Sequence, residues 1–182
     1  MVQNSKKILL HACCGICSAY PISLLKEMGY EVIVYFSNSN LDTQDEFNNR
    51  LNAQKVVCNY HSVELVVDEY KHNGYLDFVK GLESELERGE RCKKCISHRL
   101  ERTVQKAKEF GINFYTTSLP ISPHKKFDMI VNLAKSINTD VEFLAIDFKK
   151  KDGFLKTNKL AKELNIYRQN YCGCEFAKSH LK

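Results

Sequence analysis

The sequence predicts a single α/β domain, a three-layer sandwich in which helices cover both faces of a mainly parallel sheet. Three observations support this fold class. Short apolar segments alternate along the chain with segments of helical periodicity. Parallel neighbours in a sheet need crossover helices, which that alternation supplies. The length of 182 residues suits one domain, and no linker or internal repeat divides residues 1–182.

Five short apolar segments are the predicted strands. They are residues 7–11, 31–36, 62–67, 114–117 and 141–146. In open sheets of this kind ligands bind at the carboxyl ends of the strands, notably where the first strand is followed by its helix. Functional residues are therefore expected just after residue 11.

The predicted helices lie between these strands. Ser18 and Pro21 open the first helix, which stops at Gly29. Thr43 and Glu46 have the capping-box pattern and start the second. The later helices are predicted at residues 75–86, at 96–107 up to a stop at Gly111, around 129–133 after Pro123, and at 154–164.

Composition narrows the functional class. No run approaches the roughly 20 apolar residues of a membrane span, and the apolar residues 8–10 are too few for a signal-peptide core, so a cytoplasmic location with no membrane partner is expected. The formal net charge of +5 is compatible with a polyanionic partner but does not require one. Eight cysteines in a reducing compartment are not expected to form lasting disulfides, which favours metal binding or redox chemistry.

Seven of the eight cysteines fall in three clusters. The clusters are Cys13, Cys14 and Cys17, then Cys92 and Cys95, and finally Cys172 and Cys174. The sulfurs of each cluster can reach one metal centre, and Gly15 and Gly173 let the backbone bend around it. Cys58 stands apart on the apolar face of a predicted helix, where we expect a small buried hydrophobe.

The number of cysteines favours a catalytic site over a structural one. A structural zinc site or a 4Fe-4S cluster takes four ligands, so seven thiolates leave three for a second metal or an open catalytic position. A thioredoxin-type dithiol is the competing interpretation of Cys92 and Cys95, but that motif should follow the first strand. His11, next to the first cluster, is either a ligand or proton donor or a hydrogen-bonded core residue.

Basic residues surround the second cysteine cluster. Lys93, Lys94, His98, Arg99 and Arg102 suit an anionic metal cluster or phosphate groups, and a solvated helix face explains them equally. No Gly-x-Gly-x-x-Gly follows the first strand, so any electrons should come from an external donor such as a ferredoxin or flavodoxin.

Four segments are distinctive when taken together: residues 9–18 (LLHACCGICS), 91–96 (RCKKCI), 116–125 (TTSLPISPHK) and 167–174 (YRQNYCGC). In this combination they resemble the QueH family of epoxyqueuosine reductases. The resemblance implies a fold similar to the PP-loop and adenine-nucleotide-hydrolase (HUP) group. It also implies reductive deoxygenation of epoxyqueuosine to queuosine at the wobble position of tRNA.

The cofactors implied by the resemblance are a 4Fe-4S cluster and an adjacent single metal, iron, for which zinc could substitute. The metal ligands would come from the N-terminal, central and C-terminal cysteine clusters. We predict that Cys17, which can be aspartate in relatives, binds the single metal with Cys13 or Cys14, and that most other thiolates hold the cluster. Cys17 and His11 are the candidate catalytic residues.

The wider set of proton-donor candidates is His11, Tyr35, Tyr115 and Tyr171. Tyr35 or Tyr171 could also stack on a wobble base that has left the anticodon stack. Two rival functions remain open. A PP-loop sulfur-transfer enzyme would need a phosphate loop where residues 13–17 stand, and a non-catalytic RNA-binding module would carry zinc or a cluster without turnover.

Overall fold

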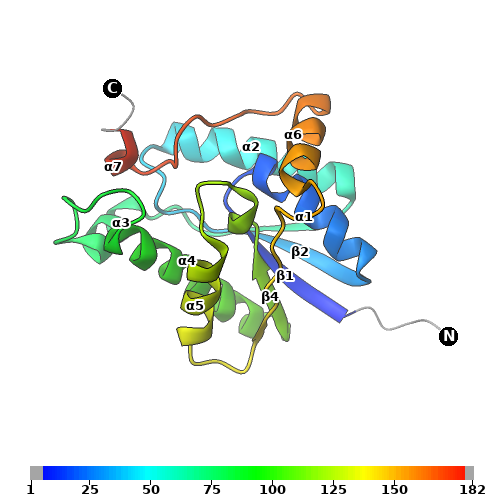
Figure 1. Ribbon diagram of the computed structural model, residues 1–182, viewed down its shortest axis with the longest axis horizontal. Coiled ribbons are helices and arrows are strands. Elements are labelled where there is room, and N and C mark those ends of the chain that lie inside the picture. Colours follow the sequence, from blue (N-terminus) through cyan, green and yellow to red (C-terminus); the bar gives the residue numbers. More distant parts are fainter. Residues whose placement is uncertain (1–5, 179–182) are drawn as a thin grey trace.

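The computed structural model describes residues 6–178 and contains a five-stranded parallel sheet (Figure 1). The strand order is β3-β2-β1-β4-β5, and every neighbouring pair is parallel. The strands are β1 (Lys6–Ala12), β2 (Tyr30–Phe36), β3 (Glu64–Val67), β4 (Phe114–Thr117) and β5 (Glu142–Phe143). The predicted fold class is therefore confirmed.

Helices cover both faces of this sheet (Figure 1). One face carries α1 (Gly15–Glu27), α2 (Gln44–His61) and α6 (Gly153–Glu163), and the other carries α4 (Glu90–Glu109) and α5 (Phe127–Ser136). The remaining helices are α3 (His72–Val79), a 3₁₀ turn at Leu119–Ile121, and the short α7 (Glu175–Lys178). In the part of the chain that the structure describes, no helix combines the length and apolarity needed to cross a membrane.

Alternate residues of β1 supply the two apolar cores. Ile8 and Leu10 pack with α1, whereas Leu9 packs with α4. All three are fully buried, as expected for a central parallel strand covered on both faces. Cys58 is 2% exposed in the first of these cores, so its predicted role as a small buried hydrophobe is confirmed.

Three helix boundaries differ from the prediction. The first helix begins at Gly15 instead of Ser18, because the Cys14 side chain caps it. The helix predicted at residues 75–86 ends at Val79, because Arg91 donates to three carbonyls in residues 82–85 and holds that segment as a loop. The next helix already begins at Glu90, so it carries both central cysteines.

The sheet ends and the C-terminal segment also differ. Strand β5 has only two residues, since after Leu144 the backbone turns on itself and Ile146 N–H bonds the Leu144 carbonyl. The sequence predicts no helix where the structure has α7. Glu175 at its start hydrogen-bonds His72 of α3, so the C-terminal segment returns across the molecule (Figure 1).

The sheet order reverses at β1, which pairs with β2 on one side and with β4 on the other. Such a reversal opens a crevice at the carboxyl ends of the two diverging strands. The residues after β1 are Cys13 and Cys14, and those after β4 are Ser118 and Leu119. The first cysteine cluster therefore lies at the predicted ligand position.

Candidate metal centre

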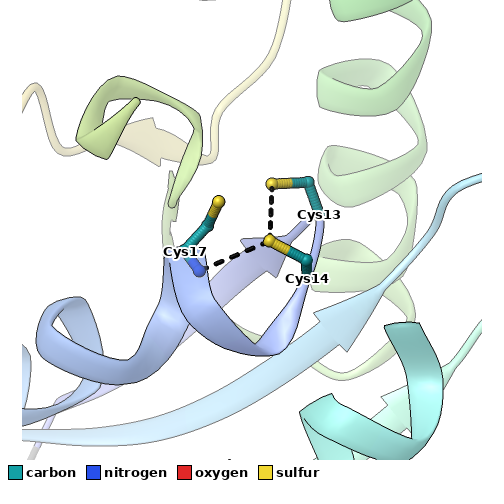
Figure 2. A group of neighbouring side chains, drawn as sticks. All are labelled: Cys13, Cys14 and Cys17. Atoms are coloured by element: carbon teal, nitrogen blue, oxygen red, sulfur yellow. Dashed lines mark hydrogen bonds between the residues drawn. The ribbon is translucent and has the colours of Figure 1, made fainter. Parts of the chain in front are cut away.

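The first cysteine cluster forms a compact group of sulfurs at the carboxyl end of β1. The Sγ atoms of Cys13, Cys14 and Cys17 all lie within 4.8 Å of one another, and those of Cys13 and Cys14 are 3.8 Å apart. Figure 2 shows the side chains converging from the end of β1 and the first turn of α1. We call these residues the three-cysteine group.

Local backbone structure places this group. Cys14 is the N-cap of α1, and its sulfur accepts a hydrogen bond of 3.4 Å from the backbone N–H of Cys17. Glycine is needed at position 15 because a Cβ there would lie 2.7 Å from the backbone carbonyl of Ala53 on α2. The thiols meet within one turn of chain, so the group needs no distant segment to form.

The thiols of the group influence one another's ionisation. Hydrogen bonds from Cys14 and Cys17 to the Cys13 thiolate lower the pKa of Cys13. The same contact with Cys13 raises the pKa of Cys17, and burial raises the pKa of Cys14. Crowded thiols that share one negative charge are suited to a cation, which replaces their protons when it binds.

Cys95 of α4 lies with the C-terminal cysteines Cys172 and Cys174, and we call these three together with Cys92, three residues earlier on the same helix, the four-cysteine group. Cys95 and Cys174 are buried in one apolar cluster against which Cys172 packs. A hydrogen bond between Cys172 and Cys174 lowers the pKa of the first and raises that of the second. Burial raises the pKa of Cys95, and the nearby charges of Cys172 and Cys92 add to this effect.

Contacts with α2 hold the C-terminal cysteines in place. Arg50 of α2 donates to the backbone carbonyls of Tyr171 and Cys172, both at 3.1 Å, and its Nε donates to Glu46 at 2.6 Å. Between the cysteines, Gly173 has φ +107, and a Cβ there would lie 2.8 Å from Arg50 Nη2. The four-cysteine group therefore depends on tertiary contacts.

Two basic side chains, the buried Arg99 and the partly buried Lys125, lie near thiolates of these groups. Arg99 is 5% exposed; burial lowers its pKa, but the thiolate charges of Cys95, Cys172 and Cys13 outweigh this and raise it. Lys125 donates to Cys172 Sγ at 3.5 Å, and that charge raises its pKa against the effect of burial. These side chains offset the negative charge of a thiolate-rich centre.

A cavity of about 410 Å³ opens between the two groups. Its walls include Cys13 and Cys17 from the three-cysteine group, Cys172 from the four-cysteine group, and both Arg99 and Lys125. The volume lies within the usual range for small-molecule sites. A reacting group in this cavity would be next to both sets of sulfurs.

The structure separates the candidate proton donors. His11 is fully buried and does not line the cavity. Its ring nitrogens hydrogen-bond Thr117 Oγ1 and the Ser37 carbonyl. Burial lowers the pKa of His11 to about 4. The geometry thus favours the hydrogen-bonded core alternative for His11. Tyr35 and Tyr115 are also fully buried, so stacking of a base on Tyr35 is excluded, while Tyr171 does line the cavity.

The sequence predicts two alternative roles for the basic residues of α4, either to face an anionic centre or to form a solvated helix face, and the structure divides the residues between them. Arg99 faces the sulfurs, whereas Arg102 pairs with Asp68 at 2.6 Å and Lys93 with Glu90 at 2.6 Å. Sequence reasoning gave no role to Arg50, Lys125 or Gln169. No spacing pattern identifies these three residues, because each comes from a different segment: Lys125 and Gln169 contact sulfurs, and Arg50 bonds backbone carbonyls beside Cys172.

Comparison with known proteins identifies the family. The sequence model described as "Epoxyqueuosine reductase QueH" matches residues 8–180. The Streptococcus pyogenes serotype M1 relative of that name is 36% identical over 178 residues, covering 93% of this chain and 69% of the relative. The Thermotoga maritima relative is 33% identical over 175 residues, covering 93% and 89%.

Two solved structures share the fold at low sequence identity. The U34-tRNA thiolase NcsA from Methanococcus maripaludis with its [4Fe-4S] cluster has a TM-score of 0.63 and 13% identity, covering 97% of this chain and 62% of its own. The NMN synthetase from Francisella tularensis has a TM-score of 0.54 and 13% identity, covering 91% and 66%. These likenesses show that the chain shares the α/β fold of both solved structures.

The match to the family model covers nearly the whole chain and includes all seven clustered cysteines. The relatives are about one-third identical over most of their length. The chain belongs to the epoxyqueuosine reductase QueH family, and it is an oxidoreductase with epoxyqueuosine reductase activity.

Proposed function

We propose that this reductase deoxygenates epoxyqueuosine within tRNA by means of a 4Fe-4S cluster held by the four-cysteine group and a single iron held by the three-cysteine group. The observation that carries the proposal is the cavity whose walls contain sulfurs of both groups. The 4Fe-4S cluster of the structurally similar tRNA thiolase is consistent with it.

The spacing of the sulfurs supports this division. A tetrahedral metal with metal–sulfur bonds of about 2.3 Å separates its sulfur ligands by about 3.8 Å. Cys13 and Cys14 have that separation, and the third sulfur lies within 4.8 Å. Among the described residues, no other set of three or more potential ligands is as compact. The four-cysteine group offers the number of thiolates that a 4Fe-4S cluster takes.

The division refines the sequence-based assignment. That assignment paired Cys17 with either Cys13 or Cys14, whereas the geometry favours all three on the single metal. Cys92, Cys95, Cys172 and Cys174 would then supply the four cluster ligands. Zinc fits the three-cysteine group as well as iron does, so it could replace the single iron in protein prepared in air.

The chemistry explains why a metal centre is needed. Converting an epoxide to an alkene and water takes two electrons and two protons, and a metal centre can relay electrons from an external donor through repeated turnovers. A single metal with an open position supplies Lewis acidity toward the epoxide oxygen, and an adjacent cluster supplies electrons. The cavity then holds the epoxide beside Cys13 and Cys17, with Arg99 and Lys125 offsetting the negative charge.

The partners follow from the same site. The substrate would be a tRNA whose modified wobble base enters the cavity, where Tyr171 on the wall is available for stacking. Arg88 and Arg168 also line the cavity, so phosphate contacts and a fall in affinity with salt are expected. A reduced ferredoxin or flavodoxin in the cytoplasm would supply the electrons.

The test is direct turnover. Anaerobically purified enzyme is reduced and incubated with tRNA that carries epoxyqueuosine, the RNA is digested, and the modified nucleoside is followed by mass spectrometry. The expected result is loss of one oxygen atom. An unchanged mass with cluster-replete enzyme, when a known reductase converts the same tRNA, would support the RNA-binding-module alternative.

A further inference from the structure

Phe154 is an exposed aromatic residue on the wall of the cavity. It is the second residue of α6 and is 43% exposed, and the next residue, Leu155, is 67% exposed. Of the described residues that line the cavity, only Phe154 and Tyr171 carry a six-membered aromatic ring. A single exposed apolar side chain is common on protein surfaces, so a role for Phe154 depends on its surroundings.

A guanidinium group is held beside the same part of α6. Asn158, which also lines the cavity, donates from Nδ2 to the Phe154 carbonyl at 2.7 Å and accepts at Oδ1 from Arg168 Nη2 at 2.8 Å. Arg168 is exposed and lines the cavity too. An aromatic ring and a cation therefore come from adjoining positions at the opening of the cavity.

The backbone that carries Phe154 is closely packed. Lys151 and Asp152, just before α6, have φ +54 and +59, a left-handed conformation that costs free energy in residues other than glycine and is frequent at functional sites. A Cβ on Gly153 would lie 1.7 Å from the Phe148 carbonyl oxygen. Helix α6 packs along α1 (Figure 1). The Phe154 ring is therefore presented from a well-supported turn.

Positive charge predominates around this ring. Three lysines at residues 149–151 precede α6, and on the cavity wall the exposed residues Arg88 and His124 contact each other at 3.3 Å. Among the described residues of the wall, one carboxylate, that of Glu87, stands against the basic groups of Arg50, Arg88, Arg99, Lys125 and Arg168. Aromatic faces combined with basic groups are typical of surfaces that bind single-stranded nucleic acid.

We propose that Phe154 positions the RNA substrate by stacking on the base next to the wobble nucleotide, while Arg168 binds a phosphate beside that base. A wobble base that turns into the cavity leaves its neighbour without a stacking partner on one side. The Phe154 ring replaces that partner. The inference rests on the proposed entry of the wobble base into the cavity, and it assumes no particular division of the sulfurs between metals.

This contact separates RNA binding from the chemistry at the metal centre. Every base has a π face, so stacking on Phe154 holds the anticodon loop without reading its sequence. A free nucleoside has no neighbouring base and gains nothing from the ring. The contribution of Phe154 should therefore appear in the affinity for RNA.

The test uses an anticodon stem-loop RNA that carries epoxyqueuosine, with 2-aminopurine at one or the other position flanking the wobble nucleotide. The emission of 2-aminopurine falls when it stacks on an aromatic ring. Wild type, Phe154→Ala, Phe154→Leu and Phe154→Tyr are compared in binding titrations and in turnover. Phe110→Ala is the matched control, because Phe110 is also 43% exposed but lies at the end of α4 that precedes β4, away from the cavity.

Phe154→Ala should weaken RNA binding by about 5- to 150-fold, the usual contribution of one base stacked on an aromatic ring. Most of the loss in turnover should appear in KM, and bound 2-aminopurine should emit more strongly at one flanking position. Phe154→Tyr keeps the ring and should behave like wild type, as should Phe110→Ala. Arg168→Gln should reduce the slope of log affinity against log salt by about 1.

Iron and sulfide assays accompany each variant, and their values should be unchanged. Phe154→Leu keeps apolar bulk without an aromatic face, so it tests stacking even if the Ala variant loses metal. Wild-type affinity in the Ala and Leu variants, or weaker binding with no change in emission at either position, would overturn the role of Phe154. A wild-type enzyme that neither binds the stem-loop nor removes its epoxide oxygen would instead refute the proposed function.

Discussion

The three-cysteine group and the four-cysteine group contain the same ligand atoms but are assembled differently. Cys13, Cys14 and Cys17 lie within one turn of chain, and the N-cap of α1 places them. The four-cysteine group combines cysteines of α4 with those of the segment before α7, and Arg50 of α2 holds that segment through two of its backbone carbonyls. A local site is therefore set by backbone geometry, whereas a composite site is as stable as the tertiary contacts that hold its halves together.

The largest effects should come from two separate variants, each of which removes one metal ligand from one of the groups. Cys174→Ser is expected to eliminate the cluster, so that iron falls from about five per chain to about one and labile sulfide disappears. Cys17→Ser should lose only the single iron and keep its sulfide. Both variants should lose turnover. Iron and sulfide assays on anaerobic protein distinguish the outcomes, and sulfide retained in Cys174→Ser would show that the division of ligands is wrong.

A smaller but still large effect is expected from the anchor of the composite site. Arg50 and Glu46 are 3% and 7% exposed, so Arg50→Met leaves a buried carboxylate and should lower the free energy of unfolding by about 3–5 kcal/mol. Denaturant unfolding checks the loss, and cluster content should fall with it.

The exposed pair of Lys7 and Glu31 is the matched control for Arg50. Its side chains are 56% and 51% exposed, so Lys7→Met should change the free energy of unfolding by less than about 0.5 kcal/mol. Equal losses of unfolding free energy in Arg50→Met and Lys7→Met would mean that burial does not increase the contribution of the Arg50 pair to stability.

The next effect concerns the attachment of α4 to the sheet. Asp68 follows β3 and accepts from Arg102 of α4 at 2.6 Å and from Ser37 at 2.7 Å. Burial raises the pKa of Asp68, but these hydrogen bonds outweigh it and hold the pKa below 3.8. Asp68→Asn should therefore lower the free energy of unfolding by about 1–2 kcal/mol at pH 7.

The pH dependence of that loss has a defined sign. Because the pKa of Asp68 is lower in the folded protein, its stabilisation is fully present above the unfolded value of 3.8 and is lost as pH falls through the folded value. The difference between wild type and Asp68→Asn should shrink in the same range. Unfolding measured from pH 7 to about pH 2 checks this, and a difference independent of pH would contradict it.

The smallest effect should come from the cysteine outside both groups. Cys58 is 2% exposed in the core and accepts a hydrogen bond of 3.4 Å from Gln54 Nε2. Cys58→Ser places a hydroxyl among apolar groups and should cost about 1 kcal/mol in unfolding free energy. Metal content and turnover should stay at wild-type values, and loss of iron would show that a ligand has been misassigned.

Much of the fold and part of the site could be predicted because both rest on local patterns. Apolar segments such as residues 31–36 and the helix cap at Thr43 can be identified from a few consecutive residues. One boundary error occurs where a side chain from outside the segment intervenes. Arg91 ends the helix predicted at residues 75–86 by bonding carbonyls of the loop before α4, and no pattern within that segment reveals it.

The sequence by itself determined the fold class, the seven candidate ligands and the resemblance to the family, because periodicity and cysteine spacing are local properties of the chain. Only the tertiary structure decided which cysteines meet, that His11 is enclosed in the core, and that Gln169 reaches Cys14. The physical reason is that sulfur–sulfur distances, burial and hydrogen bonds depend on how separate elements pack, and packing brings together residues that sequence separation keeps apart.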